Sequence, residues 1–169
     1  MIQHSPDTLH ARYLGPVLRY VRCRVENAEE AEDITADIFI AAFSSLHKVR
    51  NGSDPYPWLL RIARRKIADY LRKQAKKPVS LPPNLGGGTN PHAALEQDEA
   101  VAKIQEIVLG LSGDQREAIL LQYLDRLSIE AIASVMRKTP AAVNSLLQRA
   151  RANIYQAGRA YFLANEVTE

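Results

Sequence analysis

The sequence has a single cysteine and no long apolar run. Because Cys23 is the only cysteine among 169 residues, the chain can form neither an internal disulfide nor a cysteine-based zinc site. No apolar run approaches the roughly 18 residues that a membrane span needs. The polar beginning MIQHSPDTLH lacks the charged and apolar regions of a signal peptide. We therefore expect a cytoplasmic protein without a membrane span, held together by packing.

Motifs of catalysis and cofactor binding are also missing. His4, His10, His47 and His92 are scattered, and the sequence contains neither a glycine-rich phosphate loop nor a nucleophile motif. The carboxylates of residues 29–37 suggest a di-iron site, but no Glu-x-x-His pair accompanies them. The sequence thus predicts no catalytic residue, no metal site and no cofactor, and the protein is not expected to be an enzyme.

Signals of β-strands are nearly absent, whereas apolar residues recur at intervals of three and four almost everywhere outside one gap. That gap, KKPVSLPPNLGGGTNP, contains four of the nine prolines and three consecutive glycines, a composition that a packed helix does not tolerate. We predict an all-α fold of two small helical domains, residues 1–74 and 93–169. A flexible Pro/Gly linker, residues 75–92, joins them.

Two local signals bear on where helices begin. Gly15-Pro16 is expected to break or kink the beginning of the first helix. Ser112 and Gln115 form the pattern of a capping box, in which each side chain satisfies a free amide at the start of a helix that runs to about Leu124.

The arrangement of charge is more informative than the net charge of +3. Residues 26–37 contain six acidic residues and no basic one. Residues 61–77 contain eight basic residues and one acidic one, and residues 137–159 contain five basic residues and no acidic one. Acidic side chains are favoured in the first turns of a helix, which is one explanation of the first group. The two separated basic segments suggest two contacts with one long polyanion.

A helix predicted from Trp58 to Lys73 combines a cationic stripe with an apolar face. The stripe contains Arg61, Arg65 and Arg72. It can follow a phosphate backbone, while Tyr56 and Trp58, beside the loop of residues 51–57, can stack on unpaired bases. The alternative is that the arginines only solubilise the helix and Trp58 belongs to the core, which we favour for this tryptophan.

Residues 128–154 have the plan of a helix-turn-helix: a short helix beginning at Ser128, a turn of three or four residues, and a long helix beginning at Thr139-Pro140. Helices that read the major groove place N-terminal residues near base edges and basic residues near phosphates. We assign Asn144, Ser145 and Gln148 to base contacts, and Arg149 and Arg151 to the backbone. The alternative is an ordinary helical hairpin with a solvated basic face.

Taken in order, these segments resemble an extracytoplasmic-function (ECF) sigma factor of bacterial RNA polymerase over nearly the whole chain. AEEAEDITADIFIAAF resembles the family's acidic, aromatic helix, which binds the clamp helices of the largest polymerase subunit. WLLRIARRKIADYLRK resembles the helix that contacts and helps to melt the minus-ten promoter element. LSGDQREAILLQYLDRLSIEAIASVMRKTPAAVNSLLQRAR resembles the C-terminal domain, whose helix-turn-helix reads the minus-thirty-five element. The resemblance implies a protein that binds core RNA polymerase and directs promoter recognition and transcription initiation.

The residue patterns and the resemblance together define three groups of predicted contacts. The core-polymerase group is Glu32, Asp33, Asp37 and Phe39. The minus-ten group is Asn51, Tyr56, Trp58, Arg61, Arg64, Arg65 and Arg72. The minus-thirty-five group is Lys138, Thr139, Asn144, Ser145, Gln148, Arg149 and Arg151. The family's loop that holds a flipped base corresponds to residues 51–57, so this loop is expected to set promoter choice.

Three positions depart from the family's pattern. Ala36 stands where a glutamine is frequent, Phe43 where a tryptophan is frequent, and Arg137 where the helix-turn-helix turn commonly has glycine. If the turn needs a positive φ angle, Arg137 is strained there.

The expected partners are core RNA polymerase and promoter DNA, with an anti-sigma factor as the usual further partner in this family. The main alternative is a helix-turn-helix transcriptional regulator that acts independently of core polymerase, with an N-terminal dimerisation or sensing module. A second alternative is a helical interaction module that has lost promoter activity. The coupling of an acidic helix to two basic surfaces favours the sigma factor, since a regulator needs only one surface that reads DNA.

Overall fold

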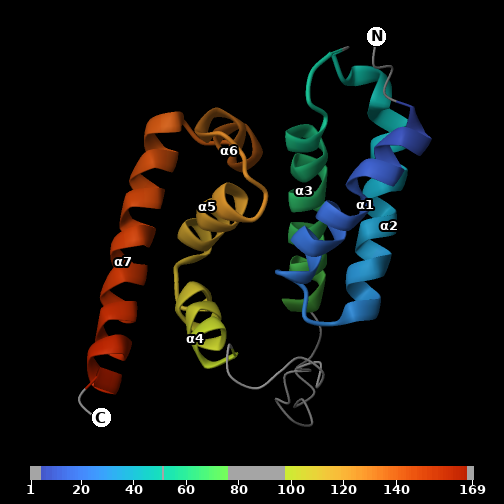
Figure 1. Cartoon of the computed structure of the whole chain (residues 1–169). Coiled ribbons are helices and arrows are strands. Elements are labelled where there is room, and N and C mark those ends of the chain that lie inside the picture. The colour runs from blue at the N-terminus through green and yellow to red at the C-terminus, as the bar shows by residue number, and fades with distance from the viewer. Residues whose placement is uncertain (1–4, 51, 76–97, 167–169) are drawn as a thin grey trace. The chain divides into compact units, whose positions relative to one another are not determined.

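The computed structural model describes residues 5–50, 52–75 and 98–166, and within these ranges all regular structure is helical (Figure 1). The elements in chain order are α1 (Pro6–Arg22), α2 (Ala28–Ser45), the 3-10 helix η1 (Leu46–Lys48), α3 (Tyr56–Ala75), α4 (Asp98–Leu109), α5 (Gly113–Tyr123), α6 (Ile129–Met136) and α7 (Pro140–Glu166). The all-α prediction is confirmed.

The helices divide into two compact units. One contains residues 1–78 and 130–138, and the other contains residues 79–129 and 139–169. Helices α1, α2 and α3 lie in the first unit and α4, α5 and α7 in the second, while the boundary between the units falls within α6, after Ile129. Of the predicted linker, residues 75–92, only Ala75 lies within the described residues, where it ends α3.

Helix α1 begins earlier than the glycine-proline pair suggested and continues through Pro16. A capping box starts it: the Ser5 hydroxyl accepts from the Thr8 amide at 3.2 Å, and the Thr8 hydroxyl accepts from the Ser5 amide at 3.1 Å. Pro16 has no N–H to donate to the preceding turn. Buried side chains on both sides of it, Tyr13 and Val17 among them, anchor the helix across that missing bond.

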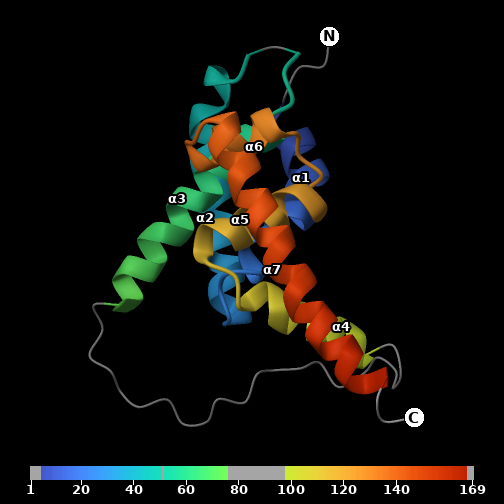
Figure 2. The same ribbon diagram turned by 90° about the vertical axis from the view of Figure 1, so that its left-hand side faces the viewer.

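In the first unit, α1, α2 and α3 lie side by side, as both ribbon views show (Figures 1 and 2). Their shared core contains Val17, Tyr20, Val21, Ile34, Ile38, Ala42, Leu59, Leu60, Ala63 and Ile67. Hydrogen bonds join the start of α2 to the end of α3: the Glu30 carboxylate accepts one from the Tyr70 hydroxyl and another, at 2.9 Å, from the Gln74 side-chain amide. Helix α3 begins and ends two residues outside the predicted range of 58–73.

In the second unit, α4 and α5 pack against α7 (Figure 2). The core consists of Ala118, Ile119 and Leu121 of α5 with Val143, Leu147 and Ala150 of α7. The predicted capping box at the start of α5 is wrong: Ser112 is the N-cap residue, but its side chain makes no capping bond. The Gln115 side-chain oxygen instead accepts a hydrogen bond from the Asn153 side-chain amide at 3.1 Å. A tertiary hydrogen bond to α7 thus replaces the local capping bond that the sequence pattern predicted.

Candidate functional site

The acidic surface of α2 begins at a well-formed N-cap. Asn27 accepts a hydrogen bond from the Glu30 amide at 3.0 Å, and the helix that follows exposes four carboxylates: Glu29, Glu32, Asp33 and Asp37. Glu32 pairs with Arg22 at 2.9 Å, and the Asp37 carboxylate lies 3.8 Å from the Lys66 ammonium. Exposed ion pairs of this kind contribute little stability, so these carboxylates stay accessible to a cationic partner.

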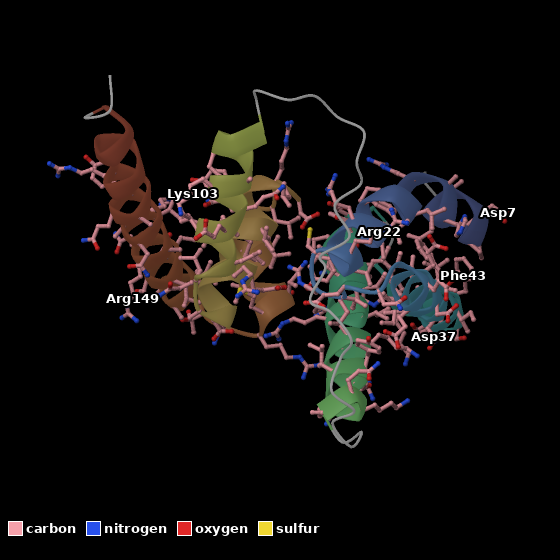
Figure 3. The ribbon with its side chains drawn as sticks, turned by 90° about the horizontal axis from the view of Figure 1, so that it is seen from below. Asp7, Arg22, Asp37, Phe43, Lys103 and Arg149 are labelled. Atoms are coloured by element: carbon pink, nitrogen blue, oxygen red, sulfur yellow. The ribbon has the colours of Figure 1, made fainter. Side chains whose placement is uncertain are left out.

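Phe39, predicted among the polymerase contacts, is 3% exposed and belongs to the core. Its ring meets His10 edge-on, with 4.9 Å between centroids, and lies 5.9 Å from the Phe43 ring. The large apolar side chains exposed on this helix are Ile40, at 63%, and Phe43, at 37%. Figure 3 shows Asp37 and Phe43 projecting from α2. α2 therefore presents apolar and acidic side chains together.

Ile40 was missed by the sequence reasoning, and Phe43 was noted as a departure from the family's pattern but not as a contact. The available signal is the width of the apolar face of α2. Ile34, Ile38 and Ala42 already make a complete buried ridge, so the two further large apolar residues fall on its flank. An apolar band wider than one packed face indicates a second surface to be covered.

The loop before α3 is held by two sets of hydrogen bonds. The Ser53 amide and hydroxyl both donate to the Arg50 carbonyl, at 3.2 and 2.7 Å, and Gly52 has φ +82°, a value that glycine adopts without strain. One carboxylate oxygen of Asp54 accepts from the Tyr13 hydroxyl at 3.2 Å and from the Tyr56 amide at 3.0 Å. Asn51, a predicted minus-ten contact, lies outside the described residues.

The two aromatic residues at this loop occupy different environments. Tyr56 is 8% exposed and stacks on Tyr13, with 5.3 Å between ring centroids and 10° between the ring planes. Trp58 is half-buried. Tyr56 is thus one of the residues that support the loop, and of the two rings only Trp58 retains appreciable exposure.

The cationic face of α3 consists of Arg61, Arg65 and Arg72, all exposed, on the helix whose Leu59, Ala63 and Ile67 are buried. Arg64 is half-buried. Arg72 also forms an ion pair with Asp69 one turn before it. The structure therefore separates the three arginines from the core, as a helix that binds a polyanion requires.

The turn between α6 and α7 consists of Arg137, Lys138 and Thr139. Arg137 has φ 54°, and the Lys138 amide donates to the Ala133 carbonyl at 3.0 Å, which is the six-to-one bond of a Schellman motif. Thr139 caps α7 by accepting from the Ala142 amide at 3.2 Å. The sequence left the φ angle of this turn open, and the structure gives Arg137 the positive value at which a side chain is strained.

The predicted minus-thirty-five contacts on α7 are all exposed, but one of them, Arg151, is also hydrogen-bonded to α5. Asn144, Ser145, Gln148 and Arg149 are exposed, whereas Val143, Leu147 and Ala150 are buried. Arg149 projects from α7 on the side away from α4 (Figure 3). Arg151 is also exposed but donates to the Gln122 side chain at 2.8 Å and to the Tyr123 hydroxyl at 3.2 Å. Arg151 thus ties α7 to α5, while the other four residues form an open polar face.

Among the described residues, no group of three or more His, Cys, Asp or Glu side chains is placed to hold a metal ion. Within the same part of the chain, no helix is long and apolar enough to cross a membrane.

Comparison with protein families finds two matches that follow these surfaces. Residues 9–77 match the family model of sigma-70 region 2, and residues 102–154 match that of sigma-70 region 4. The first range contains the surfaces of α2 and α3, and the second contains α6, the turn and the exposed face of α7.

Relatives among characterised proteins extend over most of the chain. The ECF RNA polymerase sigma factor SigM of Bacillus subtilis is 30% identical over 149 residues, which cover 86% of this chain and 90% of SigM. The ECF RNA polymerase sigma-E factor of Escherichia coli K12 is 30% identical over 161 residues, covering 88% of this chain and 84% of that protein.

Solved structures share the fold. The sigma factor RpoE of Bartonella quintana, solved with the anti-sigma factor NepR, aligns with a TM-score of 0.69 at 20% identity, over 90% of this chain and 96% of that one. CnrH, solved with the cytosolic domain of CnrY, aligns with a TM-score of 0.66 at 20% identity, over 92% and 88% of the two chains.

Matches to both sigma regions disfavour a regulator that acts without polymerase. Sigma factors are not catalytic enzymes, and they act on RNA polymerase inside the cell. The chain belongs to the ECF subfamily of RNA polymerase sigma factors, the subunits that bind core RNA polymerase and direct it to promoters.

Proposed function

We propose that three surfaces divide the work of this sigma factor between two domains. Residues 1–74 form the domain that binds core polymerase and the minus-ten element, residues 93–169 form the domain that binds the minus-thirty-five element, and residues 75–92 link them. The two separate family matches, at residues 9–77 and 102–154, support this division. It also explains why the chain carries two basic segments rather than one.

The polymerase contact is assigned to the exposed side of α2. Glu32, Asp33 and Asp37 supply negative charge, and Ile40 and Phe43 supply apolar area beside it. An interface gains most of its affinity from apolar anchors surrounded by polar groups, which is the composition of this surface. Phe39 supports the surface from beneath, through its packing against His10 and Phe43.

The minus-ten contact is assigned to α3 and the loop before it. Arg61, Arg65 and Arg72 lie along one side of the helix, where they can follow a strand of phosphates. Trp58 and Arg64, both half-buried, stand at the edge of that face. The loop that contains Asn51 is assigned to base selection.

The minus-thirty-five contact is assigned to the turn before α7 and to its exposed face. Asn144, Ser145 and Gln148 carry hydrogen-bonding groups for base edges, and Arg149 carries charge for the backbone. Lys138 and Thr139 lie at the start of the helix, where DNA-reading helices approach phosphates. Arg151 reaches DNA only by leaving its partners on α5, so we place it at the margin.

An anti-sigma factor is proposed as a further partner, and the cytoplasm as the place of action. Two sigma factors with this fold were solved in complexes, one with an anti-sigma factor and one with the cytosolic domain of another protein. The exposed acidic and apolar surface of α2 is one that an inhibitor would have to cover to prevent binding to polymerase.

The observation that carries this proposal is that three exposed surfaces, one acidic and apolar and two basic, coincide with the two matched regions. Its test is to combine the purified chain with core polymerase and genomic promoter fragments. We expect a stable complex and transcripts with defined starts. Replacing Asp37 and Phe43 together by alanine should weaken the complex with core polymerase, whereas Arg149→Ala should leave that complex intact and weaken upstream-element binding. Failure of the unmodified chain to form the complex or to start specific transcripts contradicts the proposal.

A further inference from the structure

We propose that Tyr13 and Asp54 are positioning residues that fix the promoter-reading loop from α1, so that base selection at the minus-ten element depends on a residue outside that loop. The inference rests on the proposed function of the loop. It assigns a part in recognition to α1, a helix that carries none of the predicted DNA contacts.

The first observation is that a single oxygen of Asp54 serves two donors. It accepts from the Tyr13 hydroxyl, 41 residues away along the chain, and from the amide of Tyr56, the first residue of α3. Asp54 itself is exposed, as part of a recognition loop must be. The carboxylate therefore joins three elements: α1, the loop and the start of α3.

The second observation is that the donor cannot move away easily. Tyr13 is 8% exposed, and its ring lies nearly parallel to the equally buried ring of Tyr56. Burial, together with the neighbouring Asp54 charge, raises the pKa of the Tyr13 hydroxyl, so the phenol remains a proton donor. Stacking on Tyr56 and bonding to Asp54 orient the same ring, which makes α1 the fixed reference for the loop.

The third observation is that the other end of the loop is fixed as well. The Arg50 carbonyl accepts two bonds from Ser53, and Gly52 supplies the positive φ there. Hydrogen bonds therefore hold Ser53 and Asp54, and residues that are already ordered lose few conformations when the loop binds a base, so that binding is tighter. Releasing the Asp54 end lowers the fraction of loops that are ready to bind.

The test uses polymerase reconstituted with the full chain and a promoter library randomised at the minus-ten element, with transcripts sequenced to measure base preference. Asp54→Ala removes the acceptor of both bonds and should reduce the preference for the best base by more than roughly tenfold, since the loss of one hydrogen bond to a charged group already costs about that factor. Tyr13→Phe keeps the ring stack and removes only one of the two bonds, so its effect should be smaller, roughly tenfold. Asp54→Asn keeps an acceptor oxygen and should restore most of the preference.

Tyr70→Phe is the matched control. It removes a tyrosine hydrogen bond to a carboxylate, that of Glu30, between the far end of α3 and α2. It should lower the unfolding temperature while leaving the base preference and the affinity for core polymerase unchanged.

The outcomes separate the inference from the proposed function. If the unmodified chain gives no specific transcripts, the proposed function fails and the inference fails with it. If the unmodified chain transcribes selectively but Tyr13→Phe and Asp54→Ala keep its base preference, the inference alone is overturned. It is also overturned if Tyr70→Phe relaxes the preference as much as Tyr13→Phe does, since a loss of stability would then explain both. Should Asp54→Ala fail to fold, Tyr13→Phe and Asp54→Asn decide the result.

Discussion

Replacing Arg137 by glycine should stabilise the protein, because the turn before α7 holds this arginine at φ 54°. A side chain with a Cβ in the left-handed region costs about 1–2 kcal/mol. Glycine removes that cost but loses about 0.5–1 kcal/mol more backbone entropy on folding than alanine does. The difference between the two ranges is about 0–1.5 kcal/mol, and its middle, about 0.5–1 kcal/mol, is the expected net gain. The Arg137 side chain is exposed, so few contacts are lost.

The measurement is thermal unfolding of the full chain, in which a gain of this size raises the midpoint by roughly 3–6 °C for a domain of fewer than 100 residues. Arg137→Ala is the matched control: it removes the same charge but keeps the Cβ, so it should give little or no gain. Arg126 has φ 53° and is also exposed, and Arg126→Gly should give a similar, additive gain. Equal midpoints for Arg137→Gly and Arg137→Ala would refute the conformational reasoning and assign any change to charge.

Three further predictions concern DNA binding, core packing and pH. Arg149→Ala should lower the slope of log affinity against log salt for the upstream element by about 0.9, measured by fluorescence anisotropy, and an unchanged slope would argue against a phosphate contact. Phe39→Ala should lower the free energy of unfolding by about 3–5 kcal/mol, as measured by denaturant unfolding. Phe43→Ala should chiefly weaken binding to core polymerase, as measured by titration. Similar losses of stability in the two variants would contradict the assignment. Burial raises the pKa of the Tyr13 and Tyr70 hydroxyls above 10.0, so the folded state binds these protons more tightly than the unfolded state does. The stability that this adds is complete below pH 10 and is lost as the pH rises through the folded pKa values. In unfolding measurements at alkaline pH, Tyr70→Phe should reduce this loss of stability.

Periodicity predicted the helices well because each amphipathic segment has a single way to bury its apolar stripe. The predicted DNA contacts Asn144, Ser145, Gln148 and Arg149 of α7 are exposed, while Val143 and Leu147 of the same helix are buried. The same reasoning did not tell a supporting aromatic residue from a binding one. Tyr56 and Phe39 were both predicted to contact a partner, yet both are buried in the core.

The sequence also did not predict which partner a polar side chain bonds when it can form either a local or a tertiary hydrogen bond. Gln115 has the spacing of a capping box but bonds Asn153, and Arg151 has the spacing of a phosphate contact but bonds Gln122. In each case the partner lies more than 25 residues away along the chain. No local pattern contains that partner.

The sequence by itself determined the all-α class, the family, and the separation of one acidic from two basic segments, since these depend on the order of residue types along the chain. Tertiary structure alone decided which members of those segments are free to bind. It placed Phe39 beneath the acidic surface of α2, left Ile40 and Phe43 exposed, and joined Tyr13 to Asp54. The physical reason is that helical periodicity defines a face, whereas exposure depends on which distant helix covers that face.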